Sequence, residues 1–127
     1  MQAVRVDSKD RPVEQWADPA RGSIRWQTLI SRGLTDTAGM VCGVAELDPG
    51  MDFAAHHHAQ AEVYFGLDGT GTVMIDGCAH GLAPGVVLFI PPNAVHGVPE
   101  VAAALRFLYV FATDSFDDIA YHFAQDP

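Results

Sequence analysis

The chain has 127 residues, of which 49% are hydrophobic, and it carries 16 acidic against 7 basic residues for a formal net charge of −9. This length and hydrophobic fraction fit one folded domain and exclude a disordered chain. Because phosphate backbones are bound by clustered Lys and Arg, the acidic charge argues against a nucleic-acid partner. Residues 1–15 lack an apolar signal core, and the apolar stretch 101–112 is too short to span a bilayer. We therefore expect a cytoplasmic protein with no membrane partner.

The predicted elements, taken in chain order, are short strands separated by turns. Residues 1–22 are polar and read as an N-terminal arm with short edge strands, ahead of a single domain over residues 23–127. Turn signals at Asp68-Gly69 and Asp76-Gly77 punctuate the chain, and the second has the residues of a two-residue hairpin turn. The apolar run 86–90 is typical of a buried strand. Strands are expected at 23–30, 40–47, 51–58, 62–67, 70–75, 78–82, 86–90 and 105–111.

This pattern of many short strands without an amphipathic helix predicts an all-β sandwich or barrel. Near the end of the chain, periodicity leaves two options open for the strand at 105–111. Either Phe107 and Tyr109, or Arg106 and Leu108, face the interior.

Several side chains that can bind a metal lie within residues 50–69. His56 and His58 are two apart, so they point to one face of a strand while His57 points to the other, and Glu62 and Tyr64 form a second such pair. Two imidazoles and a carboxylate on adjacent strands suit a transition metal. The alternative is a solvated histidine run, but the run is internal and flanked by apolar residues. A further ligand must come from elsewhere.

The candidate for that further ligand is His96, which follows the tight turn Pro91-Pro92-Asn93. Neutral imidazoles and a carboxylate suit Fe, Mn, Ni, Co or Zn, so we expect one divalent transition metal as the cofactor. The sequence does not discriminate among these metals.

The spacing Gly50-x5-His56-x-His58-x3-Glu62-x6-Gly69 matches the first motif of the cupin superfamily at every defined position. The resemblance implies an all-β cupin jelly-roll β-barrel, also described as a double-stranded β-helix, with one metal inside its mouth.

The stretch Gly85-x5-Pro91-x-Asn93-x2-His96-x3-Glu100 resembles the second cupin motif. It departs from that motif at two positions, with Asn93 in place of glycine and Glu100 in place of asparagine. Neither departure touches a ligand. The resemblance assigns the metal to four residues: His56, His58, Glu62 and His96.

A narrower resemblance runs from about residue 23 to residue 123. It is carried by Ile24-Arg25-Trp26, Ala45-Glu46-Leu47-x-Pro49-Gly50, Ala61-Glu62-Val63-Tyr64, Phe111-x-Thr113-Asp114-x-Phe116 and Tyr121. These stretches resemble the small cupin lyases that cleave dimethylsulfoniopropionate, a sulfonium zwitterion, to dimethyl sulfide and acrylate. The resemblance implies a small-molecule substrate.

The same resemblance gives roles to three aromatic residues. Tyr64 would take a proton from the carbon next to the substrate carboxylate, and a nearby cation should lower its pKa from about 10. Tyr121 would be a second catalytic residue, and Trp26, Tyr64 and Tyr121 would contact the substrate. The alternative for Tyr64 is an inward barrel aromatic that only shapes the pocket.

Other functions fit the same ligand set. One is a metal-dependent dioxygenase that binds O2 at the open positions of an Fe(II) ion. Another is a non-enzymatic, metal-dependent small-molecule-binding cupin. A sugar-phosphate isomerase or epimerase is disfavoured, because it would need more Lys and Arg for phosphate. We also expect a homodimer, formed through edge strands or through an arm strand around Val4 and Val6.

Overall fold

A computed structural model describes residues 1–124 and 126 of the chain. Its helices are three single 3-10 turns, and no helix in this part of the chain is long and apolar enough to cross a membrane. The turns are η1 (Ser8–Asp10), η2 (Pro19–Arg21) and η3 (Phe116–Asp118). The strands are β1 (Glu14–Gln15), β2 (Arg25–Ile30), β3 (Val41–Leu47), β4 (Phe53–His57), β5 (Glu62–Ile75), β6 (Cys78–Leu82), β7 (Val87–Ile90), β8 (His96–Phe111) and β9 (His122–Phe123).

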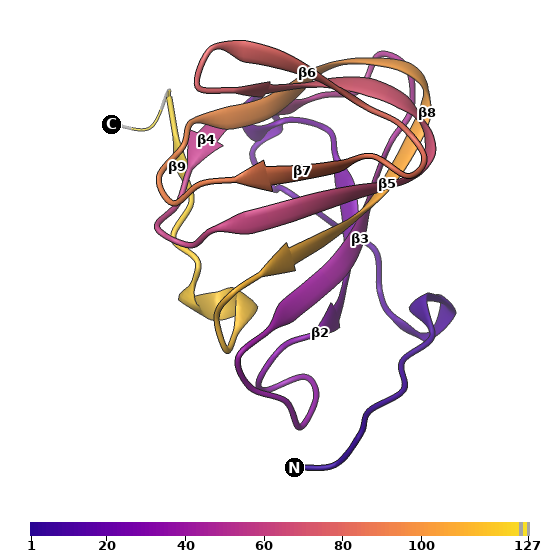
Figure 1. The fold of residues 1–127 in the computed structure, drawn as a ribbon, viewed down its shortest axis with the longest axis vertical. Coiled ribbons are helices and arrows are strands. Elements are labelled where there is room, and N and C mark those ends of the chain that lie inside the picture. Colours follow the sequence, from indigo (N-terminus) through magenta and orange to yellow (C-terminus); the bar gives the residue numbers. More distant parts are fainter. Residues whose placement is uncertain (125, 127) are drawn as a thin grey trace.

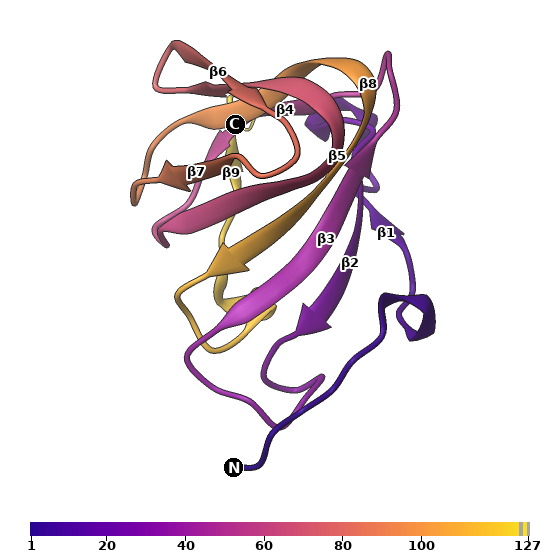
Figure 2. The same ribbon diagram turned by 45° about the vertical axis from the view of Figure 1, so that its right-hand side comes forward.

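All strand pairs are antiparallel and belong to one sheet that curls around an interior (Figures 1 and 2). One path through the sheet runs β1-β2-β3-β8-β4-β9, and β5 joins it by pairing with β6, β7 and β8. The strand β8 is thus the hub, since it pairs with β3, β4 and β5. The prediction of an all-β barrel is confirmed.

The strand β5 is continuous where the sequence predicts two strands interrupted at Asp68-Gly69. The interruption is absorbed by bulges, at which the register against β8 shifts on both sides of Asp68. Gly69 has φ 72°, and a Cβ there would overlap the carbonyl oxygen of Ala104. A glycine is therefore needed because β8 approaches too closely for a side chain, and the Asp-Gly pair marks a bulge and not a turn.

The strand β7 corrects the expectation of a buried strand. Val87 is 60% and Phe89 is 62% exposed, whereas Ile90 is fully buried. Within the described residues β7 pairs only with β5, so it forms an edge of the sheet with one side chain face outside the barrel. Phe65 lies opposite Val87 on β5 and is also exposed. The apolar side chains of Phe65, Val87 and Phe89 therefore lie on the outer surface and do not fill the barrel interior.

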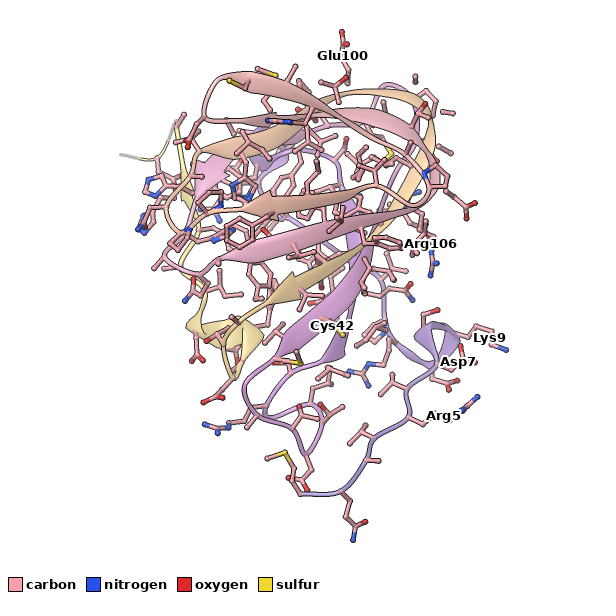
Figure 3. The ribbon with its side chains drawn as sticks, in the orientation of Figure 1. Arg5, Asp7, Lys9, Cys42, Glu100 and Arg106 are labelled. Atoms are coloured by element: carbon pink, nitrogen blue, oxygen red, sulfur yellow. The ribbon has the colours of Figure 1, made fainter. Side chains whose placement is uncertain are left out.

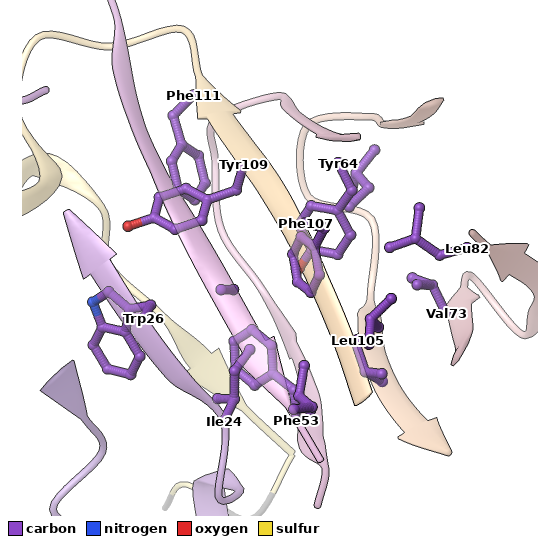
Figure 4. Close-up of a cluster of buried hydrophobic side chains, with 14 of the residues drawn as sticks. Ile24, Trp26, Phe53, Tyr64, Val73, Leu82, Leu105, Phe107, Tyr109 and Phe111 are labelled. Atoms are coloured by element: carbon purple, nitrogen blue, oxygen red, sulfur yellow. The ribbon is translucent and has the colours of Figure 1, made fainter. Parts of the chain in front are cut away.

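The barrel interior is filled by aromatic and aliphatic side chains (Figure 4). Phe107 and Tyr109 are buried on β8, which resolves the facing that periodicity left open. Arg106 points outward, as Figure 3 shows, and its Nε lies 3.1 Å from Glu46 Oε1 on β3. The turn at Asp76-Gly77 joins β5 to β6 with φ 48° and 81°, and the predicted hairpin is confirmed.

Candidate metal centre

Three histidines from two paired strands meet inside the barrel. His56 lies on β4, His58 directly follows it, and His96 begins β8, where its Cα is the antiparallel partner of His56. Each is 1% exposed, and their candidate ligand atoms lie within 4.8 Å of one another. His57 faces the other way and stacks on His122 of β9 with ring centroids 4.9 Å apart. The alternation of strand side chains therefore builds the cluster.

The hydrogen bonds of the three rings fix which nitrogen faces the centre. Each Nδ1 lies within hydrogen-bond distance of a backbone carbonyl oxygen, which can only accept, so each Nδ1 carries the hydrogen. The Nε2 atom of a neutral ring then carries a free electron pair. The Nδ1 contacts are His56 to Ala54 at 2.8 Å, His58 to Gln60 at 3.0 Å and His96 to Ala94 at 2.8 Å.

Glu62, at the start of β5, completes the cluster. Its Oε1 lies 3.2 Å from the Nε2 of His58 and 3.2 Å from the Nε2 of His96. Among the described residues, the buried Nε2 of His56 has no hydrogen-bond partner. Burial first, and repulsion from His96 second, lowers the pKa of His56 well below its ordinary value, which keeps the ring neutral.

When all three rings are neutral, the cluster presents four electron-pair donors that face one another. Buried polar atoms are normally satisfied, and a divalent cation at their centre satisfies all four at once. The donor set of three imidazoles and one carboxylate therefore fits Fe, Mn, Ni, Co or Zn.

The backbone conformation of Asn93 accounts for the asparagine in place of the glycine of the second cupin motif. Asn93 has φ 64°, in the left-handed region that asparagine adopts more readily than other side chains. Its backbone N–H donates to the carbonyl oxygen of His58 at 2.8 Å. This bond joins the turn to the residue directly after β4, and Ala94 in the same turn accepts from His96.

A narrow cavity of about 30 Å³ adjoins the cluster through Glu62. The sequence-predicted residues Trp26, Tyr64 and Tyr121 all line it, so the structure brings these three together. No Lys or Arg is among the described residues that line it. The lining is Trp16, Ile24, Trp26, Ala45, Phe53, Glu62, Tyr64, Phe107, Tyr109, Phe116 and Tyr121.

The two predicted catalytic tyrosines approach the histidines from different sides. Tyr64 follows Glu62 by two residues on β5, and its ring centroid lies 6.2 Å from that of His96. The ring of Tyr121 lies 5.3 Å from both His56 and His58. Burial, and then the charge of Glu62, raises the pKa of both phenols well above the ordinary value. Without a cation beside them, both phenols are therefore neutral near pH 7.

Sequence reasoning missed three aromatic lining residues: Trp16, Phe53 and Phe116. Trp16 lies in the segment interpreted as an arm, yet its ring centroid lies 4.9 Å from that of Trp26 and 5.0 Å from that of Tyr121. The signal that could have found it is a large aromatic residue inside an otherwise polar segment, since such residues are seldom left in water.

The chain is similar in sequence to a lyase and to a dioxygenase. The chain is 42% identical over 118 residues to dimethylsulfoniopropionate lyase DddW of Ruegeria pomeroyi, which covers 93% of this chain and 78% of DddW. It is 27% identical over 80 residues to 5-nitrosalicylic acid 1,2-dioxygenase of Bradyrhizobium sp, which covers 63% of this chain and 39% of that enzyme.

Solved structures and a family model agree on the fold. A cupin-2 domain from Rhodospirillum rubrum superposes with a TM-score of 0.76 at 20% identity, covering 99% of this chain and 82% of that one. The predicted jelly-roll barrel is confirmed. The cupin domain family model matches residues 43–111. Because this match spans more than half of the chain, and because DddW is similar over most of its length, the chain belongs to the cupin family.

Proposed function

We propose that the chain is a metal-dependent carbon–sulfur lyase that cleaves dimethylsulfoniopropionate by β-elimination to dimethyl sulfide and acrylate. The similarity to DddW supports the substrate. The observation that carries the chemistry is the position of Tyr64. It lies two residues from Glu62 on the same strand and lines the same narrow cavity.

The metal would be held by His56, His58, Glu62 and His96, whose free electron pairs converge. When bound, a divalent cation acts as a Lewis acid that holds the substrate carboxylate, favours the phenolate form of Tyr64 and stabilises the negative charge that develops on the substrate. The remaining contributions come from the side chains around the cavity.

The cavity walls suit a cation joined to a carboxylate. A sulfonium group beside aromatic faces gains about 0.5–2 kcal/mol per favourable contact, as other onium ions do. Trp26 and Tyr121 supply such faces. Because no Lys or Arg is among the described lining residues, no basic side chain of the cavity wall repels the sulfonium or competes with the metal for the carboxylate.

The elimination itself needs one proton transfer. The phenolate oxygen of Tyr64 takes the proton from the carbon next to the carboxylate, and that C–H electron pair becomes the carbon–carbon double bond. The neighbouring carbon–sulfur bond breaks with its electrons on sulfur, which leaves as neutral dimethyl sulfide. Tyr64 then passes the proton to water. Tyr121, beside His56 and His58, is the second tyrosine that would touch the substrate.

Proton NMR of metal-loaded protein mixed with dimethylsulfoniopropionate tests this proposal. The vinyl signals of acrylate are expected with at least one of Fe(II), Mn(II), Co(II), Ni(II) and Zn(II), and they should vanish in His96→Ala. Tyr64→Phe should retain one metal per chain and lose the vinyl signals. Tyr109→Phe is the matched control, because Tyr109 lines the same cavity without a proposed catalytic role. Full activity in Tyr64→Phe would remove the proposed base.

A dioxygenase is the second candidate, favoured by the similarity to 5-nitrosalicylic acid 1,2-dioxygenase. Oxygen uptake by the Fe(II) protein, without vinyl signals, would support it. A protein that holds one metal but shows neither reaction would be a metal-dependent binding module.

We also propose that the protein is a homodimer. The outer face around Phe65, Val87 and Phe89 is apolar, and β7 is an edge strand. Exposed apolar patches of this kind mark protein–protein contacts. Light scattering after size exclusion should give twice the chain mass for the native protein and the single-chain mass for Phe89→Glu. A native monomer at high concentration would contradict the proposal.

A further inference from the structure

The three histidines are buried, and the cavity beside them is narrow. His56, His58 and His96 are each 1% exposed, and the cavity of about 30 Å³ holds roughly two water molecules. Neither a metal ion with its hydration shell nor a substrate of several non-hydrogen atoms can enter such a space. A wall of the cavity must therefore move before anything binds.

The walls differ in how firmly they are held. Most lining residues lie on β2, β3, β5 and β8, which are joined by long ladders, such as the pairing of β3 with β8 from Val41 to Leu47. Trp16 and Tyr121 are different. Trp16 follows β1 and Tyr121 precedes β9, and each of these strands has two residues. These two aromatic walls lie outside the long ladders and can swing away at little cost in backbone hydrogen bonds.

Arg21 joins the two weakly held segments. Its guanidinium carbon lies 5.3 Å from the ring centroid of Trp16 and 4.6 Å from that of Phe123, the second residue of β9. Its Nη2 lies 3.7 Å from Asp126 Oδ2, beyond β9. One side chain therefore touches both the segment before β2 and the segment after η3.

The base of Arg21 is fixed to the barrel. Gly22 forms a bridge with Phe53 of β4, and the N–H of Ser23 donates to the carbonyl oxygen of Asp52 at 3.0 Å. The backbone of η2 thus stays with β4, while the side chain of Arg21 holds the two aromatic segments against it.

We propose that Trp16 and Tyr121 form the gate of the metal cavity and that Arg21 is the positioning residue that holds this gate closed. The effect of the gate on turnover rests on the proposed function. The gate itself concerns only access to the four proposed metal ligands. The fraction of molecules with an open gate should rise when the cation–π contacts and the ion pair of Arg21 are removed.

The rate of zinc release tests the proposal without turnover. Protein loaded with Zn(II) is mixed with an excess of a colorimetric chelator, and the release is followed in time. Arg21→Met keeps the length of the side chain but removes the charge, and we expect release to accelerate about tenfold. Arg21→Lys should restore part of the difference. Arg32→Met is the matched control, because Arg32 pairs with Asp114 at the surface, outside the cavity, and should leave the rate unchanged.

The rates of zinc binding and release distinguish an opened gate from a general loss of fold stability. Because opening precedes both binding and release, both rates should rise by the same factor and the dissociation constant for Zn(II) should stay constant. Unchanged rates in Arg21→Met would overturn the proposal, as would a weaker affinity with an unchanged binding rate. Should Arg21→Met fail to fold, Asp126→Asn removes the ion pair at an exposed position and should give a smaller acceleration.

Tryptophan fluorescence gives an independent readout. The chain has two tryptophans, so Trp26→Phe leaves Trp16 as the single reporter. Adding Arg21→Met should increase the quenching of Trp16 by acrylamide, and unchanged quenching would count against the gate. Faster release without acrylate formation would retain the gate and reject the lyase. If no zinc binds at all, the metal centre fails while the quenching experiment still decides the gate.

Discussion

Replacing Glu62 by glutamine should stabilise the metal-free protein while weakening metal binding. The Glu62 side chain is 4% exposed, and its Oε1 lies 3.2 Å from the Nε2 atoms of His58 and His96, which carry free electron pairs when these rings are neutral. A buried carboxylate without a donor is unfavourable, whereas the amide nitrogen of glutamine can donate to one of these rings. We expect the free energy of unfolding to rise by about 1–3 kcal/mol, and the melting temperature by about 3–10 °C.

The same substitution removes the only anionic ligand of the proposed metal. Affinity for Zn(II) should fall by about a hundredfold, equivalent to about 2.7 kcal/mol. Urea unfolding of chelator-treated protein gives the first quantity, and competition with a chelator of known affinity gives the second. The two effects have opposite signs, which separates them from general damage to the fold.

Glu46→Gln serves as the matched control for the loss of a carboxylate. Glu46 lies outside the barrel, where its Oε1 is 3.1 Å from Arg106 Nε. This exposed pair contributes at most about 1 kcal/mol, and its loss should leave the metal affinity unchanged. If Glu62→Gln instead lowers the stability of the metal-free protein, then the carboxylate has a hydrogen donor there and the neutral state inferred for the three rings is wrong.

Two further predictions concern the tyrosines and the hairpin turn. The pKa values of Tyr64, Tyr109 and Tyr121 are all raised, mainly by burial, so their contribution to stability is complete below about pH 10 and is lost as the pH rises above it. Absorbance at 295 nm should show no tyrosinate in the native metal-free protein at pH 10, and then a single rise that coincides with alkaline unfolding; a separate step near pH 10 would contradict the burial. Gly77→Ala should lower the free energy of unfolding by about 1–2 kcal/mol, because φ is 81° and no atom within 4 Å compensates. Gly81→Ala in the same hairpin also has open space but an ordinary φ, so urea unfolding should show it within about 0.5 kcal/mol of the native protein.

Part of the candidate ligand cluster could be predicted from the sequence because that part depends on local rules. Alternation along a strand places His56 and His58 on one face and turns His57 away. The approach of His96 needed the cupin spacing, since pairing of β4 with β8 is not visible in local periodicity.

The errors arise where one local pattern fits two environments. An Asp-Gly pair suits both a turn and a bulge, and only the close approach of Ala104 makes Asp68-Gly69 a bulge. An apolar run fits both a buried strand and an exposed edge strand, so the exposure of Val87 could not be predicted. Trp16 reaches the cavity through contacts with distant segments, which no sequence window contains.

The hub position of β8 has a consequence for how the chain folds. Glu62 pairs with Phe111 and Val41 also pairs with Phe111, so the ladders of β8 join residues separated by much of the domain. Such long loops must close before their contacts stabilise anything, which places the protein among slowly folding topologies. The four proposed ligands come from β4, β5 and β8, together with the residue after β4, so they meet only when this closure is complete. Capture of the proposed metal would therefore be a late event that reports a finished barrel. Metal added to the unfolded chain can instead bind the run His56-His57-His58 prematurely and delay refolding.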